Sequence, residues 1–222
     1  MKRYNNKEIK GLRIVYEDRW LVVVDKAAGV LSVSLSPRSV SVKSMLDDYF
    51  ERSHQRCRAH VVHRLDRDTS GLMVYAKSRE VQQRFEADWK GLVYDRRYVA
   101  LVEGSMPQQE GTIKSWLTIG KVFVKSSPVD NGGKLAVTHY RVLEERQGTS
   151  LVEARLDTGR KHQIRVHFAS VGCPVVGDRK YNENENENEN RAQRLMLRAY
   201  RLCFVHPVTA KRLEFESSKV RE

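Results

Sequence analysis

The sequence predicts an α+β fold in a single domain, with more strands than helices. Short apolar runs rich in β-branched residues recur between turn residues, a pattern typical of strands. Three longer segments carry apolar residues at helical spacing. Hydrophobic residues make up 40% of the 222 residues, enough to form one core, and we find no internal repeat and no flexible linker. We therefore expect one domain over residues 1–222.

Strands are predicted wherever a short apolar run lies between charged or turn residues. The first two, at residues 12–16 and 21–24, are separated by the charged turn Glu17-Asp18-Arg19, and a short extended segment follows at 30–33. Further strands are predicted at residues 72–76, 98–102, 112–117, 136–144, 150–156, 195–199, 202–205 and 213–215. The turns at 147–148 and 206–209 are expected to form hairpins.

Three segments have the apolar spacing of helices. Ser39 or Ser41 can cap the first and Ser78 the second, while Gly91 and Gly172 lie where the second and third end. The residues that share a helical face are Val42, Met45, Leu46, Tyr49 and Phe50, then Val81, Phe85 and Trp89, and last Ile164, His167, Phe168 and Val171. The sequence thus predicts three helices among many strands.

The net charge indicates the kind of partner. Lys and Arg number 40 and Asp and Glu 28, which gives a formal net charge of +12. A surplus of this size favours a polyanion, with nucleic acid first, although a solvated basic surface accounts for the charge equally well. Residues 182–190 alternate Asn and Glu and have no apolar side chain to bury, which predicts a low-complexity surface loop.

The cysteines and the N-terminal residues indicate in which cellular compartment the protein is expected. Cys57, Cys173 and Cys203 have no CxxC spacing, so neither a zinc site nor a disulfide framework is expected. The N-terminal residues lack the apolar core of a signal peptide, and no segment is apolar over the length of a membrane span. We therefore expect a cytoplasmic protein with no membrane partner and no metal.

Residues 63–77, HRLDRDTSGLMVYAK, carry the first candidate for chemistry. Asp66 lies between Arg64 and Arg67, and positive charge lowers the pKa of a neighbouring carboxylate, so this carboxylate is expected to stay ionised. Asp66 is therefore a candidate anionic nucleophile. The alternative is a turn in which Asp66 and Asp68 cap backbone amides while the arginines are solvated.

A second candidate lies in residues 159–167, GRKHQIRVH. Arg165 follows His162 by one helical turn, so the two side chains can share a face. A guanidinium group on a helix is well suited to hold a carboxylate through two hydrogen bonds, and we expect Arg165 to pair with Asp66. A phosphate contact is the alternative, and so is a basic helix whose polar face is merely solvated.

Five segments in order resemble the RluA-type pseudouridine synthases, which convert uridine into pseudouridine in folded RNA. These segments, within about residues 15–215, are YEDRWLVVVDKAAG, HRLDRDTSGLMVYAK, RRYVALVEG, GRKHQIRVHFASVGCPVVGD and RLMLRAYRLCFVHPVT. Two positions depart from the family pattern: Ala27 follows Lys26 where proline is usual, and Arg198 precedes Ala199 where histidine is common. The N-terminal part is expected to be too short for the S4-type domain of many relatives.

The resemblance implies a pseudouridine synthase fold, with a mixed, largely antiparallel sheet flanked by helices around a central cleft. It also implies that Asp66 is the catalytic aspartate and that Arg165 pairs with it. Tyr98 would stack on the uracil and move a proton, although an ordinary core aromatic on a strand is the alternative for Tyr98. The carboxylate can add to C6 of the base, stabilise charge at C1′, or take part in a route through a glycal, and these alternatives stay open. No cofactor is expected.

The target base must leave the RNA helix before it can react. By the same resemblance Arg64 is expected to fill the space that the base vacates. His63, Arg67 and His162 are further candidates for substrate binding, although His63 as a packed turn residue is an alternative. Leu72 is expected to help seal the pocket from water.

The expected partner is structured RNA, in stem-loops of ribosomal (23S) RNA, transfer RNA or both. Dispersed Lys and Arg side chains, including those of residues 52–58, are expected to bind it, and we expect a monomer without an obligate protein partner. One rival is a non-catalytic RNA-binding module such as a ribosome assembly factor, which explains the charge but not a carboxylate among arginines. The other is a metal-dependent nuclease, which needs a second acidic cluster that the sequence does not suggest.

Overall fold

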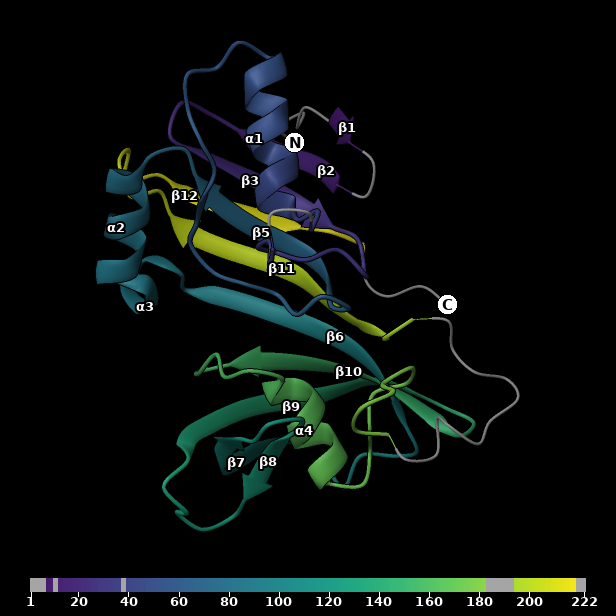
Figure 1. The fold of residues 1–222 in the computed structure, drawn as a ribbon. Helices are drawn as coiled ribbons and strands as arrows, with labels where there is room; N and C mark the ends of the chain where they lie inside the picture. Colours follow the sequence, from purple (N-terminus) through teal and green to yellow (C-terminus); the bar gives the residue numbers. More distant parts are fainter. Residues whose placement is uncertain (1–6, 10–11, 37–38, 183–193, 219–222) are drawn as a thin grey trace. The chain divides into compact units, whose positions relative to one another are not determined.

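The computed structural model describes residues 7–9, 12–36, 39–182 and 194–218. These residues belong to two compact units. Unit 1 comprises Met1–Arg96 and Ala199–Ser217, and unit 2 comprises Arg97–Arg198 and Ser218–Glu222. The secondary structure combines few helices with largely antiparallel sheet in each unit, which confirms the predicted α+β class (Figure 1). A single domain over the whole chain stays a prediction.

Unit 1 contains a sheet in the order β1-β2-β3-β5-β11, with β4 beside β5 and β12 beside β11. Its strands are β1 (Lys7–Ile9), β2 (Leu12–Glu17), β3 (Leu21–Lys26), β4 (His60–Val61), β5 (Ser70–Ala76), β11 (Leu197–Val205) and β12 (Arg212–Glu216). Neighbouring strands β2–β3, β3–β5 and β11–β12 are antiparallel. At the turn between β2 and β3, the Asp18 carboxylate accepts hydrogen bonds from the backbone N–H of Trp20 and Leu21.

The helices of unit 1 are α1 (Val42–Arg52), α2 (Arg79–Ala87) and α3 (Trp89–Leu92). Ser41, not Ser39, caps α1 in a capping box with Ser44, and Ser78 caps α2 as predicted. An apolar core joins α2 to one face of the sheet. Its buried residues are Val15, Leu21, Val23, Leu72, Val74, Ala76, Val81, Phe85, Leu202, Phe204 and Phe215.

Unit 2 is built on strands β6 (Asp95–Glu103), β7 (Glu110–Ile119), β8 (Val124–Ser127), β9 (Lys134–Arg146) and β10 (Thr149–Leu156). They follow the order β6-β10-β9-β7-β8, and each neighbouring pair is antiparallel. The helix α4 (Gln163–Ser170) packs Val166 against Leu117, Val124 and Ala136. The predicted hairpin turn is confirmed, with Gly148 at φ +77° between β9 and β10.

Some predicted elements were wrong in detail. The segment 30–33 is not a strand, because only Leu31 pairs, in an isolated bridge with Ser41. The second helix breaks at Asp88, whose carboxylate accepts a hydrogen bond from the Gly91 backbone and so begins a separate short helix. The segments 195–199 and 202–205 contribute to one strand, β11, rather than two.

The Asn/Glu repeat falls mostly outside the described residues, which resume at Arg194. Its first residue, Asn182, is buried, and its amide donates a hydrogen bond to the Glu103 carboxylate. None of the helices among the described residues has the length and apolar character that crossing a membrane requires.

Gly71 allows the backbone of β5 to approach that of β11. It has φ +119°, a conformation that side chains rarely permit, and an added methyl group would overlap the carbonyl of Ala199, with the Ala199 nitrogen only 2.7 Å away. Gly71 therefore fixes the start of the strand that follows Asp66.

We predict that Gly71→Ala lowers the free energy of unfolding by about 3 kcal/mol, because backbone strain adds to the overlap with Ala199. Urea denaturation measures the loss. Gly148→Ala is the matched control, since Gly148 also has a positive φ but nothing lies within 4 Å of an added methyl group. A loss of about 1 kcal/mol is expected there, and equal losses in both variants would contradict the account.

Candidate active site

The loop that carries Asp66 is held by backbone contacts on both sides of this residue. Ser32 Oγ donates to the Leu65 carbonyl at 2.7 Å and accepts from the Leu65 N–H at 3.2 Å. On the other side, the Arg67 carbonyl accepts from the Gly29 N–H at 3.0 Å. Asp66 itself is half-buried. Its carboxylate therefore lies between two anchored neighbours.

Lys26 provides a third anchor for this loop. Its side chain is fully buried at the end of β3, and Nζ donates to the carbonyls of Ala27 (3.0 Å), Val30 (2.8 Å) and Arg67 (2.8 Å). Burial lowers the pKa of Lys26 to about 8, while the carboxylates of Asp68 and Asp66 oppose that shift. One buried charge thus joins two segments of the chain next to Asp66.

The two arginines beside Asp66 differ in their surroundings. Arg67 is exposed, and its Nε donates to the Gly29 carbonyl at 3.2 Å and lies 4.0 Å from the Asp68 carboxylate. Arg64 is exposed and has no hydrogen-bond or ion-pair partner among the residues that the structure describes. Arg64 is therefore available to a ligand, whereas Arg67 is partly engaged by the loop itself.

His63 and Leu72 lie inside unit 1. His63 Nε2 accepts a hydrogen bond from the Val74 N–H at 3.1 Å, and its ring packs against Trp89. Burial, together with the positive charge of Arg96, lowers the pKa of His63 to about 3, so the ring is neutral. Leu72 is buried in the core. A substrate contact by either residue stays a prediction.

In unit 2, Arg165 forms a buried ion pair with Asp178. Nε and Nη2 donate to the two carboxylate oxygens, each at 2.7 Å, and the Asp178 side chain is fully buried. The Arg165 guanidinium also lies 5.1 Å from the centre of the Tyr181 ring. The helix-borne guanidinium thus holds a carboxylate through two hydrogen bonds, as its chemistry predicts, but this partner was not foreseen. Pairing with Asp66 stays a prediction.

The other two candidates of unit 2 are His162 and Tyr98. His162 precedes α4 in a left-handed conformation (φ +55°), and its Nδ1 lies 2.7 Å from the Tyr181 hydroxyl. Tyr98 is buried on β6, where it pairs with Ala154 of β10. Both side chains are thus ordered by their surroundings, while their contact with a substrate stays a prediction.

Sequence reasoning missed three residues that order the candidate site. Ser32 carries no periodic or motif signal, and its partner lies 33 residues away. Asp178 ends the family-like segment that contains Arg165, but nothing in the sequence pairs these two residues, which are 13 positions apart. Lys26 did carry a signal. It lies at the end of an apolar strand, inside a segment that resembles the family, and a lysine there must either be buried or point out of the sheet. The conflict between an apolar strand and a charged side chain could have identified Lys26 from the sequence.

Comparison with known proteins identifies the family. The family model for RNA pseudouridylate synthase matches residues 20–170. An uncharacterized RNA pseudouridine synthase of Bacillus subtilis, YjbO, is 35% identical over 207 residues, which cover 93% of this chain and 72% of that protein. Ribosomal large subunit pseudouridine synthase D of Pseudomonas aeruginosa is 36% identical over 217 residues, with 93% and 68% covered.

Solved structures agree with these matches. Human RNA pseudouridylate synthase domain containing 1 has a TM-score of 0.78 at 26% identity, covering 99% of this chain and 86% of that one. A second human structure, RNA pseudouridylate synthase domain containing 4, has the same fold with a TM-score of 0.74. The chain belongs to the RNA pseudouridylate synthase family, whose members are isomerases that act on uridines of RNA. The resemblance seen in the sequence is thereby confirmed.

We predict that Lys26→Met lowers the free energy of unfolding by about 3 kcal/mol, because three buried carbonyls lose a charged donor while the cost of burying the charge is relieved. Urea denaturation measures the loss. Lys90→Met is the control, since Lys90 is exposed on α3, and a change within about 0.5 kcal/mol is expected there. A Lys26→Met protein as stable as this control would contradict the anchoring role.

Proposed function

We propose that this protein isomerises uridine to pseudouridine in structured RNA, with Asp66 as the nucleophile. The observation that carries the proposal is the Asp66 loop, in which the backbone on both sides of the carboxylate is anchored by Lys26, Gly29 and Ser32. A carboxylate ordered in this way can act without the cost of organising the loop during the reaction. Family membership favours this enzyme over a non-catalytic RNA-binding module.

The reaction balances without a cofactor. The N1–C1′ bond of uridine breaks, the uracil turns while it stays bound, and C5 bonds to C1′ as C5 loses its proton and N1 gains one. An anionic carboxylate can serve this sequence as a nucleophile at C6 or by stabilising positive charge at C1′. In a route through a glycal, a C2′ proton is also removed, and it is returned to C2′ when C5 bonds to C1′.

Tyr98 and Arg165 complete the catalytic set that we propose. Two observations support this proposal. Both residues lie in family-like segments, and both are fixed in unit 2, Tyr98 by strand β6 and Arg165 by its ion pair with Asp178. Tyr98 stacks on the uracil and supplies a hydroxyl for proton transfer. Arg165 stabilises the Asp66 carboxylate through its guanidinium.

Arg64 takes the place of the extruded base in this proposal. Its exposure and its lack of a partner among the described residues leave the guanidinium available for stacking and for phosphate. Arg67, His63 and His162 contribute to substrate binding, and Leu72 contributes to the apolar wall that keeps water from a sugar intermediate.

For the target we propose stem-loops of ribosomal or transfer RNA. Relatives named as synthases of the ribosomal large subunit support the ribosomal choice, and the net charge of +12 supports a nucleic-acid partner in general. We propose further that the protein acts in the cytoplasm as a monomer without an obligate protein partner.

We predict that Asp66→Asn lowers isomerisation by at least about 1,000-fold while RNA affinity changes by less than about threefold, since the side chain keeps its shape but loses its charge. The assay uses large-subunit ribosomal RNA tritiated at uracil C5, with a chelator present, and follows release of tritium from intact RNA.

Asp68→Asn is the matched control, because Asp68 is the exposed carboxylate two residues away. It is expected to release tritium at nearly the rate of the wild type. Retained turnover in both Asp66→Asn and Asp66→Ala would overturn the assignment of the nucleophile. Chelator-sensitive strand scission would instead indicate a nuclease.

A further inference from the structure

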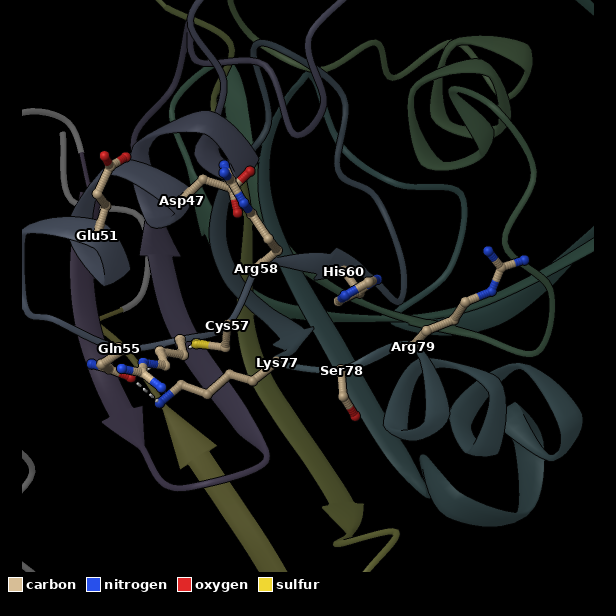
Figure 2. Close-up of a pocket in the computed structure, with 10 residues that line it drawn as sticks. Asp47, Glu51, Gln55, Cys57, Arg58, His60, Lys77, Ser78 and Arg79 are labelled. Atoms are coloured by element: carbon tan, nitrogen blue, oxygen red, sulfur yellow. Dashed lines mark hydrogen bonds between the residues drawn. The ribbon is translucent and has the colours of Figure 1, made fainter.

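Unit 1 has a second candidate for contact with a ligand, an open pocket of about 610 Å³. It lies between the C-terminal half of α1, the segment that follows it, and the junction of β5 with α2 (Figure 2). The lining residues used below are Asp47, Arg56, Arg58, His60, Lys77 and Arg79. None of the residues proposed above for chemistry or for binding the target nucleotide lines this pocket, although Arg56 and Arg58 belong to the basic segment 52–58 that was expected from the sequence to bind RNA.

The segment that bears Arg56 and Arg58 is fixed in place by its neighbours. The buried Lys77 donates through Nζ to Gln55 Oε1 at 2.9 Å, and it also binds Glu17 Oε1 and the Asp18 carbonyl, each at 2.6 Å. Further along, the Ala59 N–H donates to Asp47 Oδ1 at 2.7 Å. The two arginines therefore project from a backbone that is anchored before and after them.

Exposure alternates along this segment, because Arg56 and Arg58 are exposed whereas Cys57 is half-buried and Ala59 is buried. In an extended chain, two residues separated by one position lie about 7 Å apart along the backbone, close enough for both side chains to reach one nucleic-acid strand. In Figure 2, His60 lies between Arg58 and Arg79. The lining of the pocket thus includes three exposed guanidinium groups, those of Arg56, Arg58 and Arg79.

The charges of the pocket are unevenly compensated. Arg56, Arg58 and Arg79 are exposed, and none has a hydrogen-bond or ion-pair partner among the described residues. The Asp47 carboxylate, by contrast, binds Lys43 at 2.7 Å as well as the Ala59 N–H. Glu51 is the one lining carboxylate without a partner in the described part of the chain. Three unpaired guanidinium groups against one unpaired carboxylate leave the pocket positive.

We propose that this pocket binds the phosphodiester backbone of the RNA, outside the target nucleotide. The proposal rests on the proposed function, which supplies the RNA. Guanidinium groups bind phosphate through paired hydrogen bonds, and such contacts set the position of a nucleic acid without reading its sequence. The pocket belongs to unit 1, as Asp66 does, and Arg58 lies eight residues before Asp66 in the chain.

The test replaces both arginines of the segment. Arg56→Gln/Arg58→Gln is expected to raise the Kd for in vitro transcribed large-subunit ribosomal RNA about tenfold and to reduce the slope of log Kd against log salt by about 1.5, since two phosphate contacts are lost. Arg56→Lys/Arg58→Lys keeps the charge and is expected to recover most of the slope. Arg79→Gln, at the start of α2, is expected to give about half of the effect.

Lys90→Gln/Lys211→Gln is the control, because it removes the same charge from exposed lysines of unit 1 outside the pocket. Its Kd and slope are expected to stay near those of the wild type. Equal effects in the arginine and lysine double variants would overturn the pocket proposal. A wild type that binds ribosomal and transfer RNA without releasing tritium from either would contradict the proposed function, while the arginine comparison would still decide the pocket.

Discussion

The Asp66 loop depends on the hydrogen bonds that the buried ammonium group of Lys26 donates to backbone carbonyls. This group is buried at the end of β3, and its three hydrogen bonds go to carbonyls of two separate segments, one of them next to Asp66. Burying a charge is costly unless its hydrogen bonds are satisfied, so the position of these carbonyls is strongly constrained. The backbone next to Asp66 is in this way held in one position.

Two other buried charges in the chain position functional groups similarly. Lys77 holds the segment that bears the exposed arginines of the pocket, and Asp178 holds Arg165 on α4. Buried ion pairs contribute little net stability, but they are expensive to break, so their main effect is to select one geometry. Each holds a neighbouring segment or side chain in place, while the groups proposed to meet RNA, such as Arg64, stay exposed.

The parts of the fold that depend on local pattern could be predicted from the sequence. Apolar runs predict the strands. The helix cap at Ser78 is predicted because this serine comes just before apolar residues at helical spacing. The break at Asp88 could not be predicted, because the apolar spacing continues through Trp89 while the aspartate side chain competes for the backbone. Partners distant in sequence, such as Asp178 for Arg165, have no local signal, and their identity requires the folded chain.

The most direct test of the central claim is a crystal structure of the Asp66→Asn variant bound to a uridine-containing RNA stem-loop. The account predicts that one uracil leaves the helix, that the side chain of residue 66 lies within about 3.5 Å of its C6 or C1′ atom, and that Arg64 occupies the vacated space. A complex in which every uridine stays stacked, or in which the extruded base lies away from residue 66, would contradict the account.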